Sequence, residues 1–196
     1  MQSTTSMQIA KYGSIAISIL FCFLGCSFIW FPSYATRLQT LCAISFLIFG
    51  CIKLIGYLSK DLYRLAFQYD LEIGILLFLI GWILLIHQKH FLNLICISFG
   101  IYVIIDGLFK LRICFDAKTF GIPSWWMTAG IALGCVLFGF LLAFKPVSSH
   151  LFLMSTLGIT FLLEGVLNLV TMITMVKIID HQYSDSITTT YEESEE

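Results

Sequence analysis

Charged and amide side chains interrupt the long apolar runs of this chain, and any chemistry is expected there. Six of them form a candidate buried polar cluster: Lys53, Glu72, Asp106, Lys110, Glu164 and Asn168. A charge at the centre of a bilayer costs about 2.5–3.5 kcal/mol on insertion scales, so such a residue usually faces a partner or water. Two interpretations stay open. The cluster could bind or relay a proton or a small solute, or it could form ion pairs that lock the helices together, with lysines extending toward the membrane surface.

The spacing of these residues predicts how they pair. Asp106 and Lys110 are one helical turn apart and can pair within their own helix. Glu164 has an amide one turn further on instead of a cation, and counting from the helix ends places it deeper than the others, near the middle of its helix. Lys53 has no acid on its own helix, so its partner must come from elsewhere, and Glu72 is a candidate.

Three histidines lie in segments expected at the outer surface, namely His87, His90 and His150. Histidine titrates between pH 5 and 8, so these residues are candidate pH sensors. His87 and His90 could hold a metal, but no third ligand type is near them in the sequence, and the seven cysteines form no CxxC pair. GxSxG, HExxH, P-loop and GxGxxG motifs are absent. We therefore predict no enzymatic activity, no metal and no cofactor.

The composition indicates a membrane protein. The 196 residues are 59% hydrophobic and 12% charged, with a mean hydropathy of +0.93. An ordinary soluble domain is about 25% charged, so the lipid bilayer is the expected surrounding. A net charge of −1 leaves no basic face for phosphates, which excludes a nucleic-acid partner.

Six apolar runs are long enough to span or nearly span a bilayer: 12–31, 37–58, 70–86, 91–111, 124–144 and 150–176. A backbone in lipid must satisfy its own hydrogen bonds, so every run should be a helix. The predicted fold class is all-α, a polytopic membrane protein of six transmembrane helices in three repeated helical hairpins. The hairpins cover about 12–58, 70–111 and 124–176, after an N-terminus of residues 1–11. The tail, 177–196, ends in glutamates and should be disordered.

Glycines mark the repeat. Each hairpin has one glycine in its first helix and another 25 or 26 residues later: Gly25 with Gly50, Gly81 with Gly107, and Gly139 with Gly165. A further small residue stands seven positions before each second glycine, namely Ala43, Gly100 and Gly158. Small residues let helices approach closely, so this face should pack against the rest of the bundle.

Basic residues predict the orientation. Eight lie at the N-terminus, in the longer linkers, at the helix ends beside them or just past the last helix, and three lie in the tight turns. The positive-inside rule then places both termini in the cytoplasm.

The repeat pattern resembles a known family. The last repeat reads GIALGCVLFGFLLAFKP and then LGITFLLEGVLNL, with a mid-helix glycine, a turn proline and a glycine preceded by an acid. Over residues 12–176 this resembles the HdeD-type acid-resistance membrane proteins of bacteria, built from a short repeat of unknown function. The resemblance implies a six-helix protein of the bacterial inner membrane linked to survival of acid stress, and it supplies no catalytic or ligand residues.

The leading hypothesis is thus a non-enzymatic membrane protein of the acid-stress type, whose buried acids sense protons or pass a solute. One alternative is a small transporter or channel. Another is a membrane scaffold that recruits an unknown protein partner through its acidic tail. The chain could also form a homo-oligomer.

Overall fold

Six α-helices build the protein in the computed structural model, which describes residues 2–31, 35–58, 70–87, 91–119, 125–144 and 149–193. The helices are α1 (Gln2–Trp30), α2 (Ala35–Leu58), α3 (Asp70–Ile86), α4 (Phe91–Thr119), α5 (Trp125–Phe144) and α6 (His150–Glu193). No strand occurs within these ranges, so the all-α prediction is confirmed.

Five of the helices contain a stretch long and apolar enough to cross a membrane, within the part of the chain that the structure describes. The exception, α3, has 17 residues, at the lower limit of about 17–25 for a spanning helix. The terminal helices run further than the apolar runs: α1 starts at Gln2, and α6 continues for 44 residues to Glu193. The structure describes α6 as helix to Glu193, and the expected disorder of the tail 177–196 stays a prediction. No glycine or proline follows Gly165, so nothing in the sequence breaks the helix.

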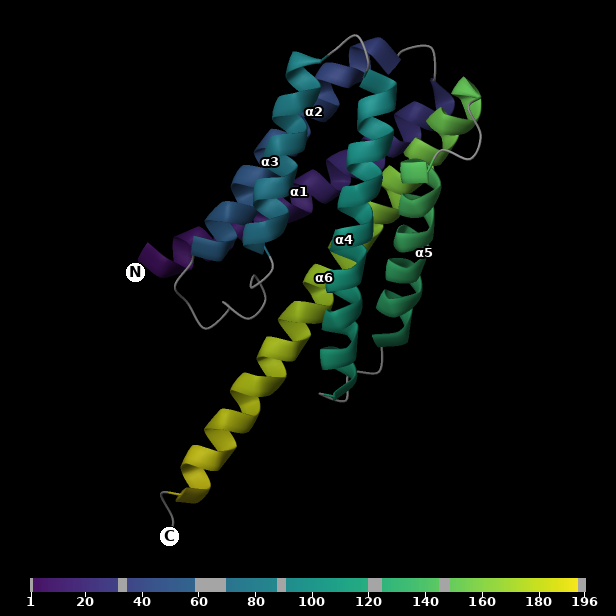
Figure 1. Ribbon diagram of the computed structural model, residues 1–196. Helices are drawn as coiled ribbons and strands as arrows, with labels where there is room; N and C mark the ends of the chain where they lie inside the picture. Colours follow the sequence, from purple (N-terminus) through teal and green to yellow (C-terminus); the bar gives the residue numbers. More distant parts are fainter. Residues whose placement is uncertain are drawn as a thin grey trace.

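Successive helices run in opposite directions, so the first residues of α1, α3 and α5 and the last residues of α2, α4 and α6 point to one end of the bundle, which we call the terminus end (Figure 1). The opposite ends of the six helices point to the other end, the turn end (Figure 1). The most extensive packing joins α2 to α3, α4 to α5 and α1 to α6. Each of these pairs takes its helices from two different repeats, and the pair of α1 with α6 closes the arrangement into a ring.

Small residues make these three contacts possible. A Cβ added at Gly25 would lie 2.7 Å from the Gly158 carbonyl oxygen, and one added at Gly81 would lie 2.9 Å from that of Ala43. The third pair is Gly139 with Gly100, at 3.0 Å. The glycine of one helix thus fits against the small residue that the repeat alignment singled out on another, which confirms the prediction that this face packs closely.

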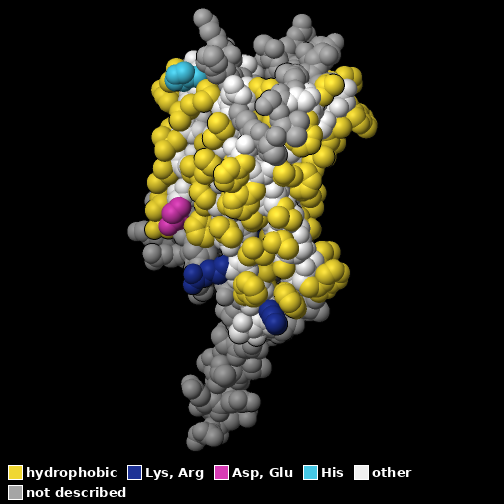
Figure 2. Space-filling view, turned by 45° about the vertical axis from the view of Figure 1, so that its right-hand side comes forward, with side chains coloured by type: hydrophobic (Ala, Val, Ile, Leu, Met, Phe, Trp, Pro, Cys, Tyr) yellow, Lys and Arg dark blue, Asp and Glu magenta, His cyan; other side chains and the backbone are white. Residues whose placement is uncertain are grey.

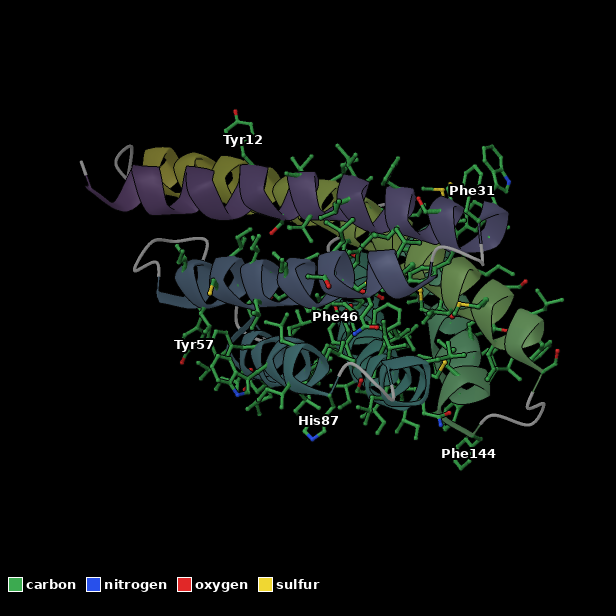
Figure 3. All side chains as sticks on the ribbon, turned by 90° about the horizontal axis from the view of Figure 1, so that it is seen from above. Tyr12, Phe31, Phe46, Tyr57, His87 and Phe144 are labelled. Atoms are coloured by element: carbon green, nitrogen blue, oxygen red, sulfur yellow. The ribbon has the colours of Figure 1, made fainter. Side chains whose placement is uncertain are left out.

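Aromatic rings fill the centre of the bundle. Phe21, Phe46, Phe99 and Phe161 come from α1, α2, α4 and α6 and are wholly buried. The Phe99 and Phe161 rings stack with centroids 4.1 Å apart, and Phe46 lies 5.4 and 5.8 Å from them. Phe21 meets the other three edge to face at 5.3–6.3 Å. Seen from above, Phe46 lies inward among the helices (Figure 3). We call these four residues the phenyl layer.

The outer surface of the bundle is apolar. Large side chains on every helix remain exposed, among them Phe23, Leu41, Trp82, Leu108, Leu137 and Leu151, at 55–65%. Figure 2 shows hydrophobic side chains over most of the visible bundle, with lysine or arginine toward one end and histidine toward the other. A surface of this kind is stable in lipid and would be exceptional in water.

Candidate functional site: a buried cluster with two acids and one lysine

One face of α4 provides the centre of the site. Tyr102, Asp106 and Lys110 follow one another at intervals of four residues, which aligns their side chains along the helix. All three are at least 96% buried. With Glu164 and Asn168 of α6 they form a continuous set of polar contacts, which we call the polar cluster.

Lys110 joins the two helices. Its ammonium pairs with the Asp106 carboxylate one turn away, which confirms the predicted pair within α4. The same Nζ donates to Glu164 Oε1 at 3.0 Å and to Asn168 Oδ1 at 2.8 Å. A single cation therefore serves two acids, one from each helix.

Glu164 is the most buried member, with no exposed surface. Its Oε1 accepts hydrogen bonds from Tyr102 at 3.0 Å, from Lys110, and from Asn168 Nδ2 at 2.9 Å. Its Oε2 receives no hydrogen bond from a donor among the described residues. Asp106 and Glu164 pair with the same Lys110 ammonium, so their carboxyl groups lie close together, and a hydrogen bond between two carboxyl groups would require a proton on one of them.

The contacts agree with the expected depth of Glu164. Glu164 follows Phe161 by three residues and Asp106 follows Phe99 by seven, and the two phenyl rings stack on each other. Glu164 therefore lies about one turn nearer the centre of the bundle than Asp106, and the Lys110 ammonium reaches both acids. The Glu164 side chain has no exposed surface, whereas that of Asp106 is 4% exposed.

Lys53 is buried, as expected, but its partner is different from the one predicted. Its Nζ pairs with Asp70 Oδ1 at 2.7 Å, whereas Glu72 is exposed and takes no part. Residues two apart lie on nearly opposite faces of a helix, so only one of the two acids of α3 can point inward. When the repeats are aligned on their first glycines, Asp70 corresponds to Ser14 and Thr128. A polar residue at this position in all three repeats could have indicated Asp70 as the partner of Lys53.

The candidate histidines lie away from the cluster. His87 is exposed at the turn end, and Figure 3 shows it at the periphery of the bundle. His90 and the side chain of His150 lie outside what the structure describes. Among the described residues, no group of three or more His, Cys, Asp or Glu could hold a metal. The polar cluster itself suits a proton better than a metal ion, because Lys110 already occupies its cationic position.

Tyr102 is the member that the sequence reasoning missed. It looks like one more aromatic residue in an apolar helix, and only its spacing from Asp106 and Lys110 indicates a polar role. Cys135 of α5 is also buried near the cluster.

The fold and the site define a class: a multi-helix integral membrane protein with an internal threefold repeat and a buried ionic cluster between two of its helices. A family model matches three times, over residues 16–86, 72–142 and 130–183. The chain therefore belongs to the family described as the short repeat of unknown function, DUF308. Successive matches overlap at α3 and at α5, the helices that pack against the preceding repeat. No curated protein and no solved structure matches the chain.

Proposed function

We propose that this is a non-enzymatic protein of the bacterial inner membrane that serves in acid stress, and that its polar cluster works by holding one proton between Asp106 and Glu164. The resemblance to acid-resistance membrane proteins supports the setting. The observation that carries the mechanism is the charge count in the cluster. Two carboxyl groups share one ammonium, and all three side chains are at least 94% buried.

Because the cluster is buried, an imbalance between its acids and its base is costly. With both acids ionised the cluster would hold an uncompensated negative charge, and an unpaired charge in a protein interior costs several kcal/mol. Two carboxylates close together also repel, so a pair of this kind retains one proton. A proton on Glu164 Oε2 supplies a donor toward Asp106 and leaves Oε1 free to accept its three hydrogen bonds.

The proton thereby links solution pH to helix packing. Its loss places two negative charges and one positive charge between α4 and α6, which weakens their contact. The stabilisation is complete while the proton is bound and is lost as pH rises until the proton dissociates. The bundle is accordingly most tightly packed under acidic conditions, which suits a protein that acts during acid stress.

The Glu164→Gln variant tests this mechanism, since it keeps the shape and removes the titrating group. We expect the apparent unfolding temperature of the wild type in detergent to fall as pH rises from 5 to 9 and that of the variant to change much less. Glu72→Gln, at an exposed acid of α3, should behave as the wild type. Equal pH dependence in the wild type and Glu164→Gln would refute proton holding at this site. Survival of acid by cells carrying each variant tests the physiological role separately.

The charge distribution supports a cytoplasmic terminus end. Arg112 and Lys118 are exposed on the last two turns of α4, at that end of the bundle. Basic residues at the membrane surface favour the cytoplasmic side.

The alternatives have less support. A transporter or channel needs an open path to the buried acids, whereas Glu164 and the phenyl layer are wholly buried in this conformation. A scaffold that works through its acidic tail depends on side chains outside those that the structure describes.

A further inference from the structure

We propose that the proton of the polar cluster exchanges with water at the terminus end only, so that the protein responds to pH on one side of the membrane. This inference rests on the proposed function and adds its sidedness. It follows from what lies above and below Glu164 along the bundle axis: a closed aromatic layer toward the turn end, and two ion pairs of increasing exposure toward the terminus end.

The phenyl layer closes the turn end. On α6, Phe161 lies one turn before Glu164, and on α4, Phe99 lies two turns before Asp106, in both cases on the side of the turn end. Phe46 has the same relation to Lys53 on α2. The rings touch one another across the bundle and have no exposed surface. Phenyl rings neither donate nor accept protons, so this layer interrupts any relay.

A graded series of charged groups leads the other way. The Glu164 side chain is 0% exposed, those of Asp106 and Lys110 are 4% and 6%, and those of Lys53 and Asp70 are 10% and 14%. Asp70 is the first residue of α3 and stands at the terminus end. The two ion pairs are close enough to interact electrostatically, since the charge of Lys53 acts on Asp106 and that of Lys110 acts on Asp70. Alternating acid and base side chains are a route along which a proton can move.

The remaining groups around the acids do not open a second route. The Tyr102 ring stacks against Phe99 of the phenyl layer at 5.7 Å, and its hydroxyl is committed to Glu164. On α5, Cys135 is buried, and on α1, Cys22 lies beside Gly165. Asn168 of α6 bonds Glu164 on the side of the terminus end. Of the three side chains that donate to Glu164, Tyr102 has no exposed surface, whereas Lys110 and Asn168 have an exposed edge and lie toward the terminus end.

Infrared spectroscopy of oriented proteoliposomes tests the sidedness directly. Vesicles are sorted on a C-terminal affinity tag into populations with the termini outside or inside, and the external pH is changed while the lumen stays buffered. The signal is the carbonyl band of the protonated carboxyl, assigned by its loss in Glu164→Gln. We expect this band to follow external pH only in vesicles with the termini outside. A protonophore should make both populations respond.

Each outcome has a separate meaning. A band that follows external pH equally in both populations would overturn the sidedness and leave the proton site intact. If no band depends on Glu164 even with the protonophore, the proposed function fails as well. Asp70→Asn should slow the response from the terminus side by roughly tenfold or more, because it removes the entry carboxyl. Glu72→Gln is its matched control and should leave the rate unchanged; equal rates in all three proteins would contradict the proposed route.

Discussion

Replacing Gly25 with alanine tests whether glycine sets the distance between α1 and α6. The added Cβ would lie 2.7 Å from the Gly158 oxygen and 2.7 Å from Leu162 Cγ. Ordinary van der Waals contact begins at 3.4 Å, so the methyl is about 0.7 Å too close to a backbone atom. A helix backbone cannot turn aside as a flexible side chain can, and the two helices must therefore separate.

The cost follows from the size of this clash. Forcing an extra methyl into a packed interior destabilises by about 1–3 kcal/mol. Alanine recovers about 1 kcal/mol through its better helix propensity, which leaves a net loss of up to about 2 kcal/mol. At roughly 2–4 °C per kcal/mol, the apparent unfolding temperature should fall by up to about 8 °C.

Gly130→Ala and Gly134→Ala provide matched controls on α5. A Cβ at either position meets nothing within 4 Å, so only the gain in helix propensity remains. We expect these variants to be as stable as the wild type or slightly more so. Stability is measured as the loss of the monodisperse gel-filtration peak after heating in detergent. A Gly25→Ala protein as stable as Gly130→Ala would refute the role of glycine in this contact.

Three further changes test the interior, with the same assay. Asp70→Asn should destabilise the protein by about 3–5 kcal/mol, because it leaves the buried Lys53 ammonium without its acid; equal stability with Glu72→Gln would contradict this. Phe161→Ala should cost about 3–5 kcal/mol by emptying the centre of the phenyl layer, whereas Phe140→Ala, 45% exposed, should cost far less. Tyr102→Phe removes the hydrogen bond that the hydroxyl donates to Glu164 and should destabilise the protein by about 1–3 kcal/mol. An unchanged unfolding temperature would show that Glu164 does not depend on this donor.

The sequence was sufficient to predict the helices and the faces on which they pack. Long apolar runs in lipid leave the backbone no alternative to the helix. Small residues seven positions apart, as in Ala43 and Gly50, identified the packing face correctly. The spacing could not predict which helix packs against which, because all six helices have small residues seven positions apart. Gly74 and Gly81 on α3, for example, fit Ala43 and Gly50 on α2 no better than the small residues of another helix would. Only the assembled bundle shows that α1 meets α6.

The site was predictable where partners share a helix and not where they come from different helices. Asp106 with Lys110, and Glu164 with Asn168, follow from the four-residue spacing alone. The bond from Lys110 to Glu164 spans 54 residues and depends on the crossing of α4 and α6. The choice of Asp70 over Glu72 depends on the rotation of α3 about its axis, which a short helix with apolar residues on every side leaves undefined.

The three repeats share their glycine positions and differ in their interior side chains, and that difference creates the site. The position before the second glycine is occupied by Phe49, Asp106 and Glu164, and the position three residues after it by Lys53, Lys110 and Asn168. In the first repeat the aromatic ring leaves Lys53 without an inward acid; its ammonium lies 5.1 Å from the Phe49 ring centroid and pairs with Asp70 toward the terminus end. In the third repeat the amide leaves Glu164 without a cation of its own, so it shares Lys110. Phe49 in the first repeat turns Lys53 toward Asp70 and so connects the cluster to the surface. Asn168 in the third repeat replaces a lysine and so leaves one acid more than there are bases. A proton site that opens to one side needs both features.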